Sequence, residues 1–83
     1  MSEEKRLSCS ITAPDTTKTY EGLRSVSIPS ATGTMQILPG HAESFVLIGD
    51  GDVILKSADG HIEILHIGQS ECHIHHDQVM IIA

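Results

Sequence analysis

The sequence has 83 residues, enough for one domain, and five Lys and Arg against eleven Asp and Glu give a net charge of −6. It contains no Trp, one Phe and one Tyr, so an aliphatic core must form, with little room for a deep ligand pocket. The acidic balance and the scattered basic residues argue against nucleic-acid binding, and no run approaches the ~18 apolar residues that membrane insertion requires.

The N-terminal residues 1–6 are polar and charged, and they lack the apolar core of a signal peptide. We therefore expect a flexible N-terminal arm over residues 1–6, a domain over residues 7–83, and a place on the cytoplasmic side of a membrane or in the cytoplasm. In a chain without an export signal, Cys9 and Cys72 are expected to be free, buried thiols.

Alternation of apolar and polar residues with a period of two dominates the chain. It runs through residues 7–13, 24–29, 62–67 and 72–76, and it places the apolar side chains of each run on one strand face. No window has convincing helical periodicity. Several short strands at this spacing predict an all-β fold, a flattened sandwich of two antiparallel sheets in one small domain.

The remaining runs predict two further strands and the turns between strands. Residues 45–48 favour a strand over a helical turn, and the continuously apolar residues 79–83 predict a strand covered on both faces. Gly and Asp tolerate positive φ, so residues 49–52 and 58–60 are predicted to form hairpin turns. Residues 76–78 are expected to turn the last hairpin.

One segment, residues 33–42, is more constrained than the rest. Pro39 fixes its own φ and favours extended geometry at Leu38, and Gly40 can then take a positive φ and turn the chain sharply. The two ring nitrogens of His41 can pin this turn to nearby backbone. Such a rigid loop suits a docking surface, although an isolated Pro-Gly turn is more often a simple corner of the fold.

The same segment carries a family resemblance. Ile-Leu-Pro-Gly-His-Ala at residues 37–42 resembles, without a gap, the signature of the epsilon subunit of F-type ATP synthases, called delta in mitochondria. Residues 11–14, residues 20–22 and the strand before Pro29 match the flanking pattern, and the resemblance covers essentially residues 7–83. The chain departs from the family at Thr34, where an acidic residue is frequent.

The resemblance implies a non-catalytic rotor subunit without a cofactor. Such a subunit links the gamma subunit of the central stalk to the c-ring, and so couples proton or sodium flow to ATP synthesis. It is peripheral, on the cytoplasmic side of the energy-transducing membrane, which in a bacterium is the inner membrane. Family members continue into a C-terminal helical hairpin, which we expect to be absent after Ala83.

The resemblance also implies two protein-interaction surfaces. The residues expected at the polar loops of the c-ring are Gly33, Thr34, Met35, Gln36, Leu38 and Gly40, with Pro39 and His41 shaping the turn. A specific interface usually buries more than ~1,000 Å² in total, so the gamma subunit should cover a substantial apolar patch. Leu47, Leu55 and Leu65 are the candidates for this patch.

Six histidines leave an alternative function open, that of a small metal-binding β-domain. His73 and His75 share a strand face at positions i and i+2, and His66 or His61 from a neighbouring strand could supply a third ligand. No carboxylate falls at a clear ligand spacing. A β-sandwich adaptor with an unrelated partner is a second alternative. No nucleophile elbow, P-loop or dinucleotide fingerprint is present, so no enzymatic activity is expected.

Overall fold

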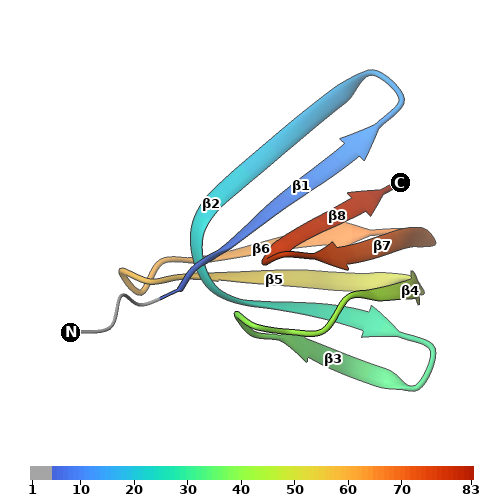
Figure 1. Ribbon diagram of the computed structural model, residues 1–83. Coiled ribbons are helices and arrows are strands. Elements are labelled where there is room, and N and C mark those ends of the chain that lie inside the picture. The colour runs from blue at the N-terminus through green and yellow to red at the C-terminus, as the bar shows by residue number, and fades with distance from the viewer. Residues whose placement is uncertain (1–4) are drawn as a thin grey trace.

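The computed structural model describes residues 5–83, which form an all-β sandwich (Figure 1). The eight strands are β1 (Leu7–Ala13), β2 (Thr16–Ser30), β3 (Gly33–Ile37), β4 (Ser44–Ile48), β5 (Gly51–Ser57), β6 (Ile62–Ile67), β7 (Ser70–His75) and β8 (Gln78–Ile82). Most of the predicted N-terminal arm, residues 1–4, lies outside the described residues, and Lys5 and Arg6 precede β1 without regular structure.

The long strand β2 joins the two layers of the sandwich. Its first half pairs with β1, and its second half pairs with β3 and β5. One layer therefore contains β3, β2, β5 and β6, and the other contains β2, β1, β8, β7 and β4 (Figure 1). The pairing register shifts on both sides of Leu23, and Gly22 has a φ of 70° there. Bulges of this kind bend a strand, which lets β2 pass from one layer to the other.

The predicted sandwich is confirmed, but one of its pairings is not antiparallel. β1 runs parallel to β8, with Cys9 opposite Val79 and Ile11 opposite Ile81. A parallel pair needs a long connection between its strands, and here almost the whole domain provides it. The two ends of the domain are thereby hydrogen-bonded to each other within one layer.

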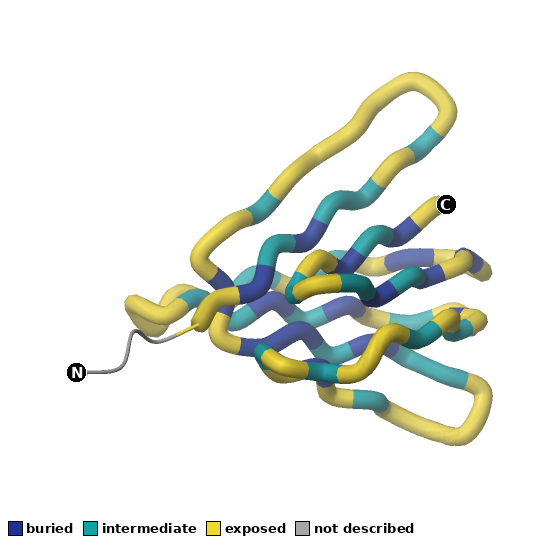
Figure 2. Tube along the Cα trace, viewed as in Figure 1, coloured by how far each residue is buried: buried dark blue, intermediate teal, exposed yellow. Residues whose placement is uncertain are grey.

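The core lies between the layers and follows the predicted alternation (Figure 2). Within residues 72–76, Cys72 and Ile74 are fully buried while His73 and His75 face outward, and Val26 and Ile28 are buried in the same way on β2. Burial of about 1.5–3 kcal/mol per large aliphatic side chain is the main source of stability for such a layer pair. The fully buried side chains are Leu7, Cys9, Val26, Ile28, Ile37, Val53, Leu55, Cys72, Ile74, Val79 and Ile81.

The prediction that residues 79–83 are covered on both faces is wrong. Val79 and Ile81 are buried, whereas Ile82 is 55% exposed. β8 has neighbours on both edges, β1 and β7, but the other layer of the sandwich covers only one of its faces. By contrast, the predicted strand at residues 45–48 is confirmed as β4.

Two of the three predicted turns join the strands of a hairpin, and the third connects the two layers of the sandwich. Residues 58–60 connect β5 to its partner β6, and residues 76–78 connect β7 to β8, with φ of 50° at His76 and 60° at Asp77. The hairpin predicted at residues 49–52 is wrong, because β4 pairs with β7 while β5 pairs with β2 and β6. This turn instead carries the chain from one layer to the other.

The layer-crossing turn passes close to the end of β2, which explains why a glycine stands at position 51. The backbone N–H of Gly49 donates to the carbonyl oxygen of Pro29 at 2.9 Å. A Cβ added at Gly51 would lie 2.9 Å from the Cβ of Pro29, closer than packed carbon atoms approach each other. Because the proline ring is rigid, either the turn or β2 would have to move.

Replacing Gly51 with Ala is therefore expected to lower the free energy of unfolding by about 1–3 kcal/mol, the usual cost of overpacking. Urea denaturation followed by circular dichroism measures this change. The matched control is Gly49→Ala in the same turn, where an added Cβ meets no atom within 4 Å. Equal losses in the two variants would show that the contact with Pro29 is not the cause.

Candidate interaction surfaces

The eight predicted docking residues lie along β3 and the connection that follows it. Gly33 begins β3 at the β2–β3 turn, and Gly40 lies beyond the other end of the strand. A five-residue strand alone separates its ends by about 13 Å. The structure therefore does not bring these residues together at one end of the molecule, but spreads them along one edge.

Along this edge the side chains differ in exposure. Thr34 and Gln36 are exposed, whereas Met35 is half-buried and packs against the core. Leu38, directly after the strand, is 50% exposed. Among the described strands β3 pairs with β2 alone, so its other edge offers backbone groups to a partner.

The Pro39–Gly40 turn is held by backbone and side-chain hydrogen bonds, as predicted. The N–H of His41 donates to the carbonyl of Leu38 at 3.2 Å, and Gly40 has a φ of 86°. His41 Nδ1 lies 2.8 Å from the carbonyl oxygen of Ala42, and this contact fixes the ring against the backbone. The N–H of Gly40 also donates to Asp77 Oδ1 at 2.7 Å, so the turn is tied to the β7–β8 hairpin.

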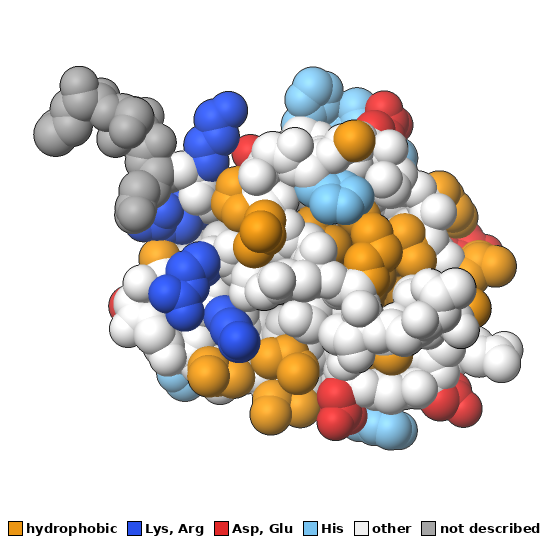
Figure 3. Space-filling model, turned by 90° about the horizontal axis from the view of Figure 1, so that it is seen from below, with side chains coloured by type: hydrophobic (Ala, Val, Ile, Leu, Met, Phe, Trp, Pro, Cys, Tyr) orange, Lys and Arg blue, Asp and Glu red, His pale blue; other side chains and the backbone are white. Residues whose placement is uncertain are grey.

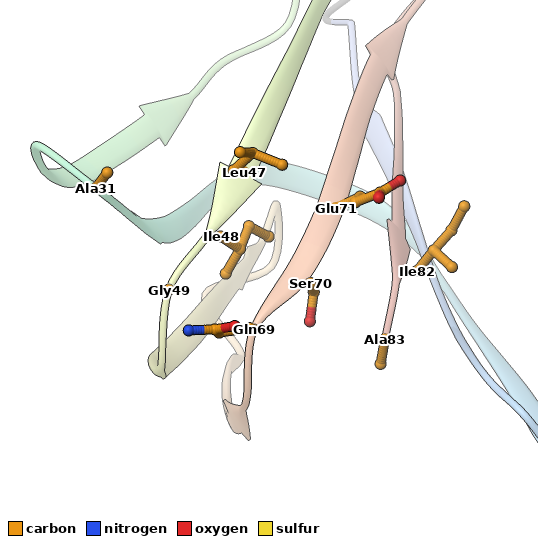
Figure 4. A pocket seen from close by; sticks show the side chains of 9 residues that line it. All are labelled: Ala31, Leu47, Ile48, Gly49, Gln69, Ser70, Glu71, Ile82 and Ala83. Atoms are coloured by element: carbon orange, nitrogen blue, oxygen red, sulfur yellow. The ribbon is translucent and has the colours of Figure 1, made fainter.

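An exposed apolar surface, here called the Leu47 patch, lies on the outer face of β4 and β8. It consists of Phe45, Leu47 and Ile82, which are 66%, 68% and 55% exposed. Leu47 is opposite Glu71, which in turn is opposite Ile82. Figure 4 shows Leu47 and Ile82 on either side of Glu71, beside a shallow hollow lined by residues of β4, β7 and β8. Side chains of this size in contact with water are typical of an interface.

Of the three leucines predicted for an exposed patch, only Leu47 is exposed. Leu55 is 1% exposed in the core, and Leu65 is half-buried and packs against it. On β5 and β6 the outward positions belong to isoleucines instead, and Ile62 and Ile64 are 54% and 61% exposed. Both faces of β6 carry apolar residues, so alternation alone did not distinguish the inner face.

Three of the five basic residues lie together, although the sequence suggested that all five are scattered. Lys5, Arg6 and Arg24 line one shallow hollow together with Ala58. Figure 3 shows Lys and Arg side chains gathered at one end of the molecule, with hydrophobic side chains spread over the rest of the face. The bulge at β2 brings Arg24 beside residues that precede β1, a proximity for which the sequence carries no signal.

His73 and His75 lie together on β7, apart from His66. His73 and His75 lie beside Glu43, whose Oε2 is 3.2 Å from His73 Nε2 and 3.3 Å from His75 Nδ1. The hydrogen bond from His73, with the nearby His75, lowers the pKa of the Glu43 carboxyl. The predicted third ligand, His66, is not part of this group, because its Nδ1 pairs with Asp52 at 3.1 Å on the other layer.

Glu43 is thus a residue that sequence reasoning missed as a partner of the histidines. It precedes β4, and β4 pairs with β7, which brings it to residues thirty and more positions further along the chain. His73 and His75 are held in place by ring contacts on either side. The ring centroid of Phe45 lies 5.7 Å from that of His73, and the ring centroid of His76 lies 4.0 Å from that of His75 in an edge-on arrangement.

Within residues 5–83, no helix is long and apolar enough to span a membrane.

Comparison with known proteins agrees with the signature in residues 37–42. The family model of the ATP synthase delta/epsilon chain β-sandwich domain matches residues 6–83. The ATP synthase epsilon chain of Micrococcus luteus is 33% identical to this chain over 58 residues, which make up 70% of this chain and 64% of that one.

Two solved structures share the fold at low sequence identity. A chain in the cryo-EM structure of the Euglena gracilis mitochondrial ATP synthase superposes with a TM-score of 0.86 at 18% identity, covering 94% of this chain and 50% of that chain. A chain in the central stalk and c-ring structure of the Tetrahymena thermophila mitochondrial ATP synthase has a TM-score of 0.75 at 8% identity. The match covers 98% of this chain and 65% of that chain.

This chain therefore spans about half to two thirds of the length of these relatives. The family model, however, covers all but the first five residues of the chain. The chain belongs to the ATP synthase delta/epsilon family, whose β-sandwich domain it forms.

Proposed function

We propose that the chain is a non-catalytic rotor component of an F1Fo ATP synthase, where it joins the gamma subunit of the central stalk to the c-ring. The observation that supports this role is the match of residues 6–83 to the delta/epsilon β-sandwich domain. The fold shared with a chain of a central stalk and c-ring structure agrees with it. The domain is then peripheral, on the cytoplasmic side of the energy-transducing membrane, which in a bacterium is the inner membrane.

The mechanism is mechanical rather than chemical. Proton or sodium flow turns the ring, and the domain holds ring and gamma subunit together so that torque reaches the catalytic head. A connector that transmits torque must resist deformation. In this domain β2 runs through both layers, and the first and last strands are paired within one layer. Close-packed interiors of this kind deform little and therefore transmit strain.

The c-ring surface in this proposal is the exposed edge formed by β3 and its following turn. Gly33, Thr34 and Gln36 present polar or small side chains to the polar loops of the ring, and Leu38 adds an exposed apolar contact. Met35 is half-buried, so its inner part packs against the core while the rest remains open to a partner. Pro39, Gly40 and His41 hold the turn, through the hydrogen bonds to Leu38 and Asp77.

The gamma surface in this proposal is the Leu47 patch. Interface centres are more apolar than their rims and are depleted of charge. The patch offers three large exposed side chains on β4 and β8, beside a hollow that a partner side chain can enter. Glu71 of the intervening strand β7 lies between Leu47 and Ile82, so Phe45 and Leu47 on β4 form its uncharged part. The outward isoleucines of β6 form the competing apolar surface on the opposite layer.

Co-purification with the gamma subunit of the same organism tests the proposal. The unmodified chain is expected to form a one-to-one complex, and Leu47→Asp is expected to weaken it by at least about thirtyfold, because a charge in an apolar interface centre costs 2 kcal/mol or more. Size-exclusion chromatography and calorimetric titration give the stoichiometry and the dissociation constant.

The matched control is Ile64→Asp, which introduces the same charge at an equally exposed aliphatic residue of the other layer. This variant is expected to bind the gamma subunit like the unmodified chain. The reverse result, with Ile64→Asp disrupting the complex and Leu47→Asp leaving it intact, would move the gamma surface to β6. Failure of the unmodified chain to bind would overturn the rotor proposal.

A further inference from the structure

Three side chains of metal-ligating types meet at the outer face of β7. His73 and His75 project from the same strand face, and Glu43 reaches them from the segment before β4. One ligand atom from each of the three lies within 4.8 Å of the others. Among residues 5–83, these are the residues whose ligand atoms lie close enough together to hold a metal ion. Each side chain is partly open to solvent, so an ion can enter without any rearrangement of the core.

The spacing of these atoms matches the coordination shell of a small divalent ion. Zinc binds His nitrogen and carboxylate oxygen at about 2.0–2.2 Å, and the edges of a tetrahedron with such bonds are about 3.3–3.5 Å. Glu43 Oε2 is 3.2 Å from His73 Nε2 and 3.3 Å from His75 Nδ1. Two edges of the tetrahedron are therefore already formed in the described structure.

From this geometry we propose that Glu43, His73 and His75 form a binding site for one divalent transition-metal ion of the zinc type, with water in the remaining position. Two imidazoles and one carboxylate suit Zn²⁺, Ni²⁺ or Cu²⁺, whereas Ca²⁺ and Mg²⁺ prefer oxygen ligands alone. The site is additional to the rotor role and does not rest on it. The hydrogen bond between His73 and Glu43, with the His75 ring beside them, holds the ligands close together, and a bound ion takes the place of the proton between them.

The ligands are held in position by neighbouring contacts. The β-strand sets the i, i+2 spacing of the two histidines, and pairing of β4 with β7 sets the position of Glu43 relative to them. Phe45 lies against the ring of His73, and His76 lies edge-on against His75. A site with less ligand freedom loses less conformational entropy when the ion binds.

Calorimetric titration of the chain, prepared without a histidine tag and freed of metal, tests this proposal with Zn²⁺ as the probe. One ion per chain is expected to bind at pH 7.5. Each of Glu43→Gln, His73→Gln and His75→Gln is expected to weaken binding by at least about tenfold.

His66→Gln is the matched control, since His66 also lies beside a carboxylate, Asp52, but has no second histidine with it. It is expected to leave zinc binding unchanged. The visible absorption of the unmodified chain with Co²⁺ gives a readout that needs no variant, and tetrahedral coordination is expected to produce intense bands. No saturable binding up to about 1 mM Zn²⁺, or equal weakening by His66→Gln, overturns the site.

Discussion

Replacing Ile28 with Ala is expected to remove about 2–5 kcal/mol from the free energy of unfolding. Ile28 is 0% exposed, and it lies in the second half of β2, where that strand pairs with β3 beside the core. The substitution loses the transfer free energy of the removed carbons and leaves a cavity that rigid strands cannot close. A domain of this length has a total stability of only about 4–12 kcal/mol, so a large share of it depends on this side chain.

The urea midpoint, followed by far-ultraviolet circular dichroism, measures the loss. Ile64→Ala is the matched control, because it makes the same chemical change at an isoleucine that is 61% exposed on β6. It is expected to shift the free energy of unfolding by less than about 0.5 kcal/mol. Similar losses at the two positions would contradict the assignment of inner and outer faces.

Cys9 and Cys72 are expected to react with a thiol reagent at pH 8 at least about a hundredfold more slowly than a free cysteine. Both are free thiols with 0% exposure. Burial raises the pKa of Cys9 to about 12, with a further contribution from Cys72, and burial raises the pKa of Cys72 to about 11. The thiolate is the reactive form, and burial reduces both its population and its access to the reagent. Labelling is measured in buffer and again in urea, where it should become rapid.

The same shifts make the stability of the domain depend on pH. In the unfolded chain the thiols ionise near their ordinary pKa of about 8.5, whereas in the folded chain they remain protonated to higher pH. Above pH 8.5 the unfolded state therefore binds fewer protons than the folded state, and the free energy of unfolding falls as the pH rises. Below that pH the thiols are protonated in both states, so they do not make the free energy of unfolding depend on pH.

Urea midpoints at pH 7, 9 and 10 measure this thiol contribution. The double variant Cys9→Ala and Cys72→Ala keeps the other titrating groups, so its midpoint is expected to fall less between pH 7 and 10 than that of the unmodified chain. Rapid labelling of the folded chain, or equal pH slopes in the two proteins, would contradict the burial of these thiols.

Local features of the sequence predicted most of the strands and the rigid turn. Period-two alternation identified the side chains that share a strand face, as for Cys72 and Ile74 against His73 and His75. The turn at residues 58–60 followed from residues that tolerate positive φ, and the family followed from the six residues that begin at Ile37. These features need only covalent geometry and near neighbours, so the sequence alone is enough to find them.

The tertiary structure alone decided which strand face is covered and which distant residues meet. Alternation could not distinguish the inner face of β6, because Ile62 and Ile64 on one face and Leu65 and Ile67 on the other are all apolar. The glycine-rich turn at residues 49–52 crosses between layers rather than closing a hairpin, because its strands have other partners.

Glu43 lies beside His73, and Arg24 lines one hollow with Lys5, only because paired strands bring these parts of the chain together. The physical reason is the same in each case. Side-chain chemistry determines which strand faces are apolar, but packing of the whole chain determines which of those faces are covered and which strands pair.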